Sequence, residues 1–140
     1  MIALDTNVLV RYLTHDEEEQ FQIAAQLIAD LERRHCPAYL SVITLCETVW
    51  VLTRAYKIDR PKIIETFEGI LGTAFFVIEN KPAVRQALDL FKIGKGDFAD
   101  YLSGVLAQRD GCSRMATFDT VLHAHAELFV SPAKAFKISR

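Results

Sequence analysis

The chain has 140 residues, of which 51% are hydrophobic and 10% aromatic, and it carries a formal net charge of -2. This length suits one domain, residues 1–140, with a single buried core, and the composition excludes a disordered or low-complexity protein. The charge argues against a domain that coats nucleic acid by bulk electrostatics, but a nuclease remains open because divalent cations invert the local charge of an acidic site.

The beginning of the sequence does not resemble a secretory segment, since it lacks a basic start and meets Asp5 and Arg11 early. No uncharged stretch reaches the length of a membrane span. The three cysteines are widely spaced and form no C-x-x-C pair, which favours reduced structural thiols over disulfides or zinc ligands. We therefore expect a soluble, cytoplasmic protein without a membrane partner.

Short apolar runs alternate with stretches of helical periodicity along the chain. The predicted strands are Ile2 to Leu4, Ala38 to Leu40, Phe75 to Glu79, Arg114 to Phe118 and Leu128 to Val130. Pro61 and Pro82 suit the first turns of helices that follow Asp59 and Asn80. This alternation predicts an α/β domain of three layers, α/β/α, with a mainly parallel central sheet and helices on both of its faces.

The segment "DEEEQFQIAAQLIADLERR" predicts a helix after the first strand. Asp16 is its expected N-cap, and Glu19 is the expected partner of Asp16 in a capping box. One face of this helix is apolar and should be buried; it consists of Phe21, Ala24, Leu27, Ile28 and Leu31.

Aspartates follow two of the predicted strands. Asp5 comes directly after the first strand, and Asp119 in "RMATFDTVL" comes after the fourth. Sites in open parallel sheets form outside the carboxyl ends of the strands. Both aspartates therefore occupy positions where a functional site is expected, although Asp5 alone would also suit an ordinary turn between a strand and a helix.

Glu47 in "SVITLCETVWVLTRAY" interrupts a helix that is apolar on nearly all sides, with Ser41 as its expected N-cap. Such a helix should be largely buried, and a buried carboxylate requires a cation, a metal or a water-filled cleft beside it. A salt bridge to Arg54, or an exposed position at the edge of the apolar face, explains Glu47 equally well. The residues of this segment leave both interpretations open.

The segment "GKGDFADYLSGVLAQRD" offers two further acids. Asp97 is placed to cap a helix whose buried stripe consists of Phe98, Tyr101, Leu102, Val105 and Leu106. Asp100 falls opposite that stripe, where it faces either solvent or a cleft. A favourable charge in the first helical turn accounts for it without any function.

Other motifs favour structure over chemistry. His123 and His125 have H-x-H spacing but no evident third ligand, so they are interpreted as surface residues of a short helix. "GKG" at residues 94–96 lacks the spacing of a phosphate-binding loop. Trp50 is expected in the core. Four basic residues would suit contacts with RNA phosphates: Arg11, Arg54, Lys92 and Lys95. Solvated surface charge is the simpler interpretation of each of them.

Taken together, "LDTNVLVRYL", "CETVWVLTRAY", "GDFADYLSGVLA" and "ATFDTVL" resemble the motifs of the PIN-domain ribonucleases, most closely the VapC-like toxins of toxin-antitoxin pairs. Each motif alone is weak, but their order and spacing are specific, and they span the chain from Asp5 to Asp119. The resemblance implies a Mg²⁺-dependent endoribonuclease with an RNA substrate, a small antitoxin protein as partner, and a homodimer.

The resemblance also assigns roles to residues. It implies an acidic catalytic site, with Asp5 and Asp100 as metal ligands and Asp97 as a possible additional acid; the full acidic set is Asp5, Glu47, Asp100 and Asp119. The implied supporting polar residues are Thr6, Asn7 and Thr117. Carboxylates from distant segments coexist when a cation offsets their repulsion, and all-oxygen ligation suits Mg²⁺ or Mn²⁺ better than zinc.

Other functions remain to be compared. A PIN nuclease with a housekeeping role in RNA processing fits the same motifs, and an adjacent reading frame for an antitoxin would separate the two roles. A receiver or a phosphatase on a similar sheet fits poorly, because the residue two positions after Asp5 is Asn7 rather than an aspartate. A non-catalytic binding module is disfavoured because a decayed site should lose its costly carboxylates.

Overall fold

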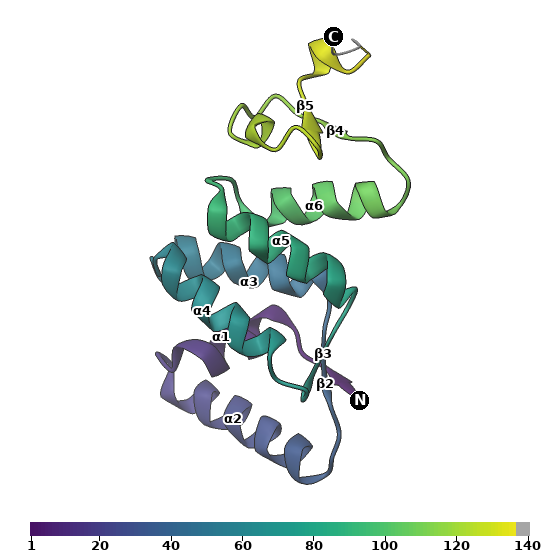
Figure 1. Cartoon of the computed structure of the whole chain (residues 1–140). Helices are drawn as coiled ribbons and strands as arrows, with labels where there is room; N and C mark the ends of the chain where they lie inside the picture. The colour runs from purple at the N-terminus through teal and green to yellow at the C-terminus, as the bar shows by residue number, and fades with distance from the viewer. Residues whose placement is uncertain (137–140) are drawn as a thin grey trace. The chain divides into compact units, whose positions relative to one another are not determined.

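The computed structural model describes residues 1–136, so the last four residues of the predicted 1–140 domain lie outside the described part. The chain divides into two compact units, Met1–Lys81 (unit 1) and the part from Pro82 onward (unit 2). Each unit is described separately, with the elements labelled in Figure 1.

Unit 1 is built around a three-stranded parallel sheet with the order β1-β2-β3. Ile2 pairs with Ala38, which in turn pairs with Phe76. Helix α1 packs against α2 and α3, and α4 packs against α3 and β3. The elements of the unit are β1 (Ile2–Ala3), α1 (Thr6–Thr14), α2 (Glu18–Arg33), β2 (Ala38–Leu40), α3 (Val42–Arg54), α4 (Arg60–Leu71) and β3 (Phe76–Ile78).

Unit 2 contains a two-stranded parallel sheet, in which Met115 pairs with Phe129 and Ala116 with Val130. Helix α6 contacts β4. Its elements are α5 (Lys81–Ile93, which begins at the unit boundary), α6 (Phe98–Arg109), β4 (Met115–Ala116), the 3₁₀ helix η1 (Leu122–Ala124), β5 (Phe129–Val130) and the 3₁₀ helix η2 (Pro132–Lys134).

The predicted α/β class and the parallel pairing of the strands are confirmed. All five predicted strands are present, and four of them are shorter than predicted. Within residues 1–136 the strands form two parallel sheets, one in each unit, where one central sheet was expected. None of the helices in this part of the chain combines the length and apolar character needed to cross a membrane.

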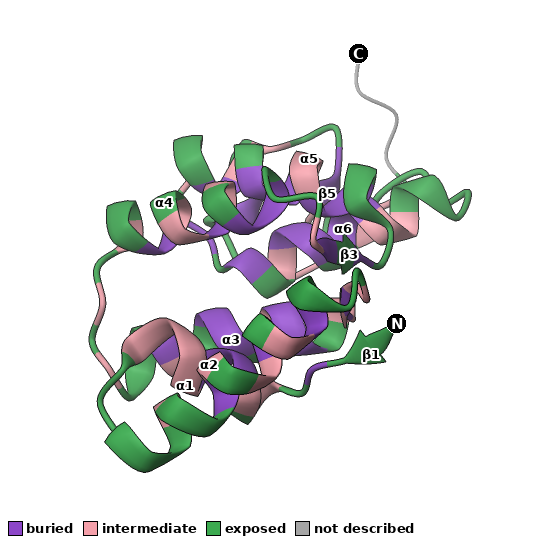
Figure 2. Cartoon of the chain, turned by 90° about the horizontal axis from the view of Figure 1, so that it is seen from below, coloured by how far each residue is buried: buried purple, intermediate pink, exposed green. Residues whose placement is uncertain are grey.

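The apolar faces predicted from periodicity form the cores of the units. In α2, Ala24, Ile28 and Leu31 are buried, and Figure 2 shows buried and exposed stretches alternating along this helix and α3. In unit 2, Phe98, Tyr101, Leu102 and Val105 are almost completely buried, as the stripe on α6 predicts. Gly104 belongs to the same face because a Cβ there would collide with the ring of Phe129.

Several helix starts follow local sequence signals. Ser41 caps α3 and Asp59 caps α4, and Pro61 and Pro82 lie in the first turns of α4 and α5, as predicted. The cap predicted for α2 was wrong.

In α2 the carboxylate of Glu17, not of Asp16, accepts the capping hydrogen bond, from the backbone N–H of Gln20 at 2.9 Å. Asp16 instead accepts hydrogen bonds from Thr14 and from the Tyr56 hydroxyl, at 3.0 and 3.2 Å. These two hydroxyls hold its carboxylate away from the helix, so the predicted capping box of Asp16 with Glu19 does not form.

Candidate functional site

Asp5 lies where β1 ends and α1 begins. Its Oδ1 accepts a hydrogen bond from the backbone N–H of Val8 at 3.0 Å, which caps the helix. The residue is exposed, and a carboxylate has further lone pairs for another partner. Thr6 occupies the first turn of α1, with Asn7 exposed beside it. Asp5 therefore fulfils the ordinary structural role of a cap and keeps an oxygen available for chemistry.

Glu47 lies on the exposed side of α3, which is one of the positions that the sequence left open for it. The helix buries one face, formed by Thr44, Leu45, Thr48, Val49 and Leu52, against its own unit. Ile43 and Trp50 lie four residues before and three after Glu47, on the same exposed side, at 68% and 62% exposure. Trp50 is therefore not a core residue, contrary to prediction.

The salt bridge considered for Glu47 is also not seen. Throughout residues 1–136, Glu47 makes no ion pair with Arg54 or with any other basic side chain. Its carboxylate is thus exposed and has no basic partner. Burial therefore gives no reason to expect a cation beside Glu47, but the carboxylate is accessible to a cation or a substrate.

Unit 2 brings Asp97, Asp100 and Asp119 into electrostatic range of one another. Partial burial raises the pKa of Asp100 above its ordinary value of 3.8, and the charges of Asp97 and Asp119 raise this pKa further. Asp97 and Asp119 are exposed, whereas Asp100 is half-buried at the start of α6. The three residues predicted from separate motifs therefore form an acidic cluster within this unit.

Asp97 differs from its predicted role as a side-chain cap. Its backbone has the extended conformation of an N-cap residue, with φ -77° and ψ 147°, but in the described structure its carboxylate makes no capping hydrogen bond. The charge of Asp97 instead acts on Asp100, whose pKa it helps to raise. The prediction that the side chain of Asp97 caps α6 was therefore wrong.

Thr117 holds the turn that carries Asp119. Its hydroxyl accepts a hydrogen bond from the backbone N–H of Asp119 at 3.0 Å, and Oδ1 of Asp119 accepts one from the N–H of Val121 at 3.0 Å. Nε2 of His123 lies 2.8 Å from the carbonyl oxygen of Thr117 and bonds to it. Thr117 therefore bonds to Asp119 through its hydroxyl and to His123 through its carbonyl oxygen. These hydrogen bonds are a physical basis for the supporting role predicted for Thr117.

The loop before Asp97 is held by Tyr101, whose burial was predicted from the sequence but whose hydrogen bonds were not. The hydroxyl of Tyr101 accepts a hydrogen bond from the Gly96 N–H at 2.9 Å and lies 3.2 Å from Nε2 of His125. A Cβ on Gly94 or Gly96 would collide with Tyr101, so glycine is required at both positions. His123 and His125 are thus half-buried structural residues rather than the surface residues that we expected.

Glu79 is a further acid that the sequence analysis did not single out. It follows β3, at the same edge of the sheet as Asp5. Its Oε1 accepts a hydrogen bond from the backbone N–H of Val42 at 2.9 Å, at the start of α3. The rule that sites lie at the carboxyl ends of parallel strands could have indicated Glu79, but this hydrogen bond gives it a structural role.

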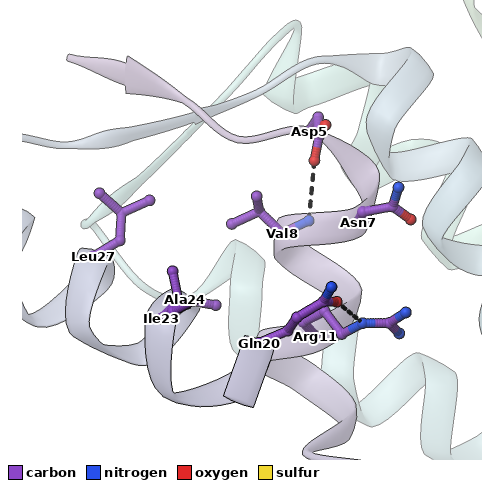
Figure 3. A pocket seen from close by; sticks show the side chains of 8 residues that line it. All are labelled: Asp5, Asn7, Val8, Arg11, Gln20, Ile23, Ala24 and Leu27. Carbon is purple, nitrogen blue, oxygen red and sulfur yellow. Dashed lines mark hydrogen bonds between the residues drawn. The ribbon is translucent and has the colours of Figure 1, made fainter. Parts of the chain in front are cut away.

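A pocket of about 260 Å³ begins at Asp5 and extends between α1 and α2 (Figure 3). The motifs did not indicate it, because half of its lining residues come from α2, which carries none of the motifs. The residues that line it are Asp5, Asn7, Val8, Arg11, Gln20, Ile23, Ala24 and Leu27.

Arg11, considered above as an RNA contact, is held within the protein at the wall of this pocket. Its Nε donates to Oε1 of Gln20 and its Nη1 donates to the Tyr56 hydroxyl, at 2.5 and 2.6 Å.

The chemistry of the acidic residues suits an oxygen-binding divalent cation. The raised pKa of Asp100 records a repulsion among carboxylates that a cation would relieve, and carboxylates are the ligands that Mg²⁺ and Mn²⁺ prefer. Within residues 1–136, however, no three acidic, histidine or cysteine side chains converge closely enough to hold a metal by themselves. Unit 2 thus supplies part of a ligand set.

Comparisons with known proteins agree with these observations. The sequence model of the PIN domain family matches residues 2–128. The chain is also similar to a protein of Aquifex aeolicus (strain VF5) named VapC ribonuclease, with 32% identity over 118 residues. That alignment covers 84% of this chain and 87% of the relative.

Proposed function

The chain belongs to the PIN domain family, and from this premise we propose that it is a Mg²⁺-dependent endoribonuclease that acts as the toxin of a toxin-antitoxin pair. The observation that carries the proposal is the acidic cluster of unit 2, where Asp97 and Asp119 raise the pKa of a partly buried Asp100. Neighbouring carboxylates repel one another, and a bound cation would offset this repulsion, so such a cluster indicates a functional site.

We propose that Asp5 and Asp100 hold the cation, with Mn²⁺ as an alternative to Mg²⁺. Glu47 and Asp119 complete the acidic site, and Asp97 is an additional acid. When bound, the cation supplies Lewis-acid polarisation of a phosphodiester and lowers the pKa of a bound water.

The chain itself supplies position and access. The hydrogen bond from Val8 fixes one oxygen of Asp5, and Thr117 fixes the turn of Asp119. The exposed carboxylate of Glu47 is accessible to water and can orient it or accept a proton from it. No histidine is needed as a base, because His123 and His125 are engaged by Thr117 and Tyr101.

The proposed activity is tested by incubating the purified protein, without any partner, with single-stranded and structured RNAs. Mg²⁺ or Mn²⁺ should support endonucleolytic cleavage, and a chelator should abolish it. Cleavage that continues unchanged in excess chelator would contradict the metal-dependent mechanism, and RNA that stays intact with every cation would contradict the ribonuclease.

The toxin role has its own test. Expression of this chain alone should arrest growth, and co-expression with a small protein from an adjacent reading frame should relieve the arrest by covering the acidic site. We also propose that the protein acts on RNA in the cytoplasm as a homodimer, which its mass in solution would reveal. Harmless expression of a protein that cleaves RNA in vitro would instead support a housekeeping role in RNA processing.

A further inference from the structure

The pocket between α1 and α2 is not used by the proposed chemistry, although it begins at a proposed metal ligand. We propose that it binds one nucleobase of the RNA substrate, that of a nucleotide next to the cleaved phosphodiester. The inference rests on the proposed function. It adds a way in which the enzyme would select its RNA substrate.

The position of the pocket determines which part of the RNA would reach it. Asp5 lines the pocket and is also a proposed metal ligand, with Oδ1 already used to cap α1. A phosphodiester at Asp5 has a nucleotide on each side, and one of their bases must lie near the adjoining surface. The pocket adjoins Asp5 and is lined by residues of α1 and α2 (Figure 3).

The size and apolar walls of the pocket suit one base. Its volume of about 260 Å³ is below the roughly 300 Å³ at which pockets for drug-sized ligands begin, so it fits a single ring system rather than a whole nucleotide. Val8, Ala24 and Leu27 supply aliphatic surface for the faces of a planar base. Ile23, which is 65% exposed, extends this surface toward solvent.

The polar groups of the pocket are fixed before any ligand binds. Arg11 donates to Oε1 of Gln20, so Gln20 has its amide nitrogen to offer a ligand. Tyr56 accepts a hydrogen bond from Arg11 and donates one to Asp16, which also lies 3.9 Å from the Arg11 guanidinium. Arginine and glutamine side chains recognise the edges of bases, and guanidinium planes also stack on them.

This arrangement favours RNA over an apolar protein anchor. A purely hydrophobic side chain would fill the aliphatic part but would leave Gln20 and Asn7 without partners on binding, a cost that a base avoids. The fixed donor of Gln20 favours a base edge that carries an acceptor, such as a carbonyl oxygen or a purine N7. Asn7 and Asp5 also line the pocket, and their side-chain oxygens can accept hydrogen bonds from donor groups of a base.

The test measures binding of short, fluorescent, 2′-O-methylated RNAs, which resist cleavage, to the full chain in Mg²⁺. One abasic residue is scanned through each position of the oligonucleotide. At one position the missing base should weaken binding, and the Gln20→Ala variant should weaken binding of the intact RNA about two- to tenfold, the range of one net hydrogen bond. Gln20→Ala should have no further effect on the RNA that lacks this base.

The chain offers matched controls for both parts of the pocket. Gln26→Ala removes the same amide from an exposed position of α2 where it bonds to Asp30, and it should leave RNA binding unchanged. Ile23→Ala should weaken binding, whereas Ile43→Ala removes an equally exposed isoleucine from α3 and should not. Circular dichroism of each variant confirms that it is folded.

Several outcomes would overturn the proposal. The base does not occupy the pocket if Gln20→Ala weakens intact and abasic RNA equally, or weakens neither. If the pocket variants bind RNA normally but lose affinity for the antitoxin, the pocket serves a protein partner instead. If the protein cleaves RNA but no abasic position weakens binding, only the proposed base site is wrong. If one base strengthens binding but the protein never cleaves RNA, only the proposed ribonuclease activity is wrong.

Discussion

Asp5, Asp59 and Asp97 all precede helices, but they use their carboxylates differently. Asp5 and Asp59 accept hydrogen bonds from backbone N–H groups of Val8 and Lys62, at 3.0 and 3.1 Å. The carboxylate of Asp97 makes no such bond within the described structure. A residue type at a capping position therefore does not establish that its side chain caps the helix.

The difference predicts opposite effects of alanine at these positions. Asp59→Ala removes a cap and should lower the free energy of unfolding by about 1 kcal/mol. Asp97→Ala removes no capping bond and relieves the repulsion on Asp100, so the free energy of unfolding should stay the same or rise. Urea unfolding of both variants in chelator measures this, and a loss at Asp97 equal to that at Asp59 would show that Asp97 caps α6 in solution.

The raised pKa of Asp100 predicts how stability depends on pH. Because the folded protein binds this proton more tightly than the unfolded chain, ionisation of Asp100 destabilises the fold as the pH rises above its ordinary value of 3.8. Asp100→Asn cannot ionise and should melt at a higher temperature than the wild type at neutral pH without cations.

The advantage of Asp100→Asn should shrink as the pH falls through the raised pKa, and it should vanish below the ordinary value. Melting curves across this range test the prediction. A variant that melts below the wild type at neutral pH would mean that the charged carboxylate stabilises the protein.

At the scale of elements, the start of α6 depends on the contact between Tyr101 and the preceding loop. Tyr101→Phe keeps the ring in the core but removes the hydroxyl that accepts a hydrogen bond from the Gly96 N–H, so the free energy of unfolding should fall by about 0.5 to 1.5 kcal/mol. Tyr12→Phe, at a half-buried tyrosine that stacks on Phe21, is the control and should change it little. Equal stability of both variants would show that the Tyr101 hydroxyl contributes nothing.

Elements with a strong local signal could be predicted from the sequence. The strands, the apolar face of α2 and the cap at Ser41 each follow from neighbouring residues, and the structure confirms them. The cap of α2 could not be predicted, because Asp16 is held by Tyr56, a residue 40 positions away. The exposure of Trp50 was missed for a similar reason, since composition does not reveal which face of an apolar helix is covered.

The acidic residues of the candidate site could be predicted from the sequence, but the contacts that support them could not. The motifs indicated Asp97, Asp100 and Asp119, and the structure places these acids within electrostatic range. The supports around them were not predictable, because the contacts of Tyr101 with Gly96 and of His123 with Thr117 depend on the folded loops. The pocket beside Asp5 was missed because its α2 residues resemble an ordinary amphipathic helix.

At the scale of the whole molecule, we consider the effect of a bound cation on stability. A cation that binds the native state should raise the melting temperature by mass action. Because Asp5 and Asp100 are both proposed ligands, Asp5→Asn and Asp100→Asn should each reduce the rise that Mg²⁺ or Mn²⁺ produces. Thermal scans with and without the cation measure this, and a full rise in either variant would exclude that residue as a ligand.

The central claim is that the acidic residues perform cation-dependent RNA cleavage, and the cleavage rate of Asp5→Asn beside that of Asp59→Asn tests it most directly. Both changes remove one charge from a helix cap, and asparagine caps about as well as aspartate, so both proteins should fold. Asp5→Asn should lose activity by orders of magnitude in saturating Mg²⁺, while Asp59→Asn should cleave like the wild type. Undiminished cleavage by a rigorously purified Asp5→Asn protein would contradict the assignment.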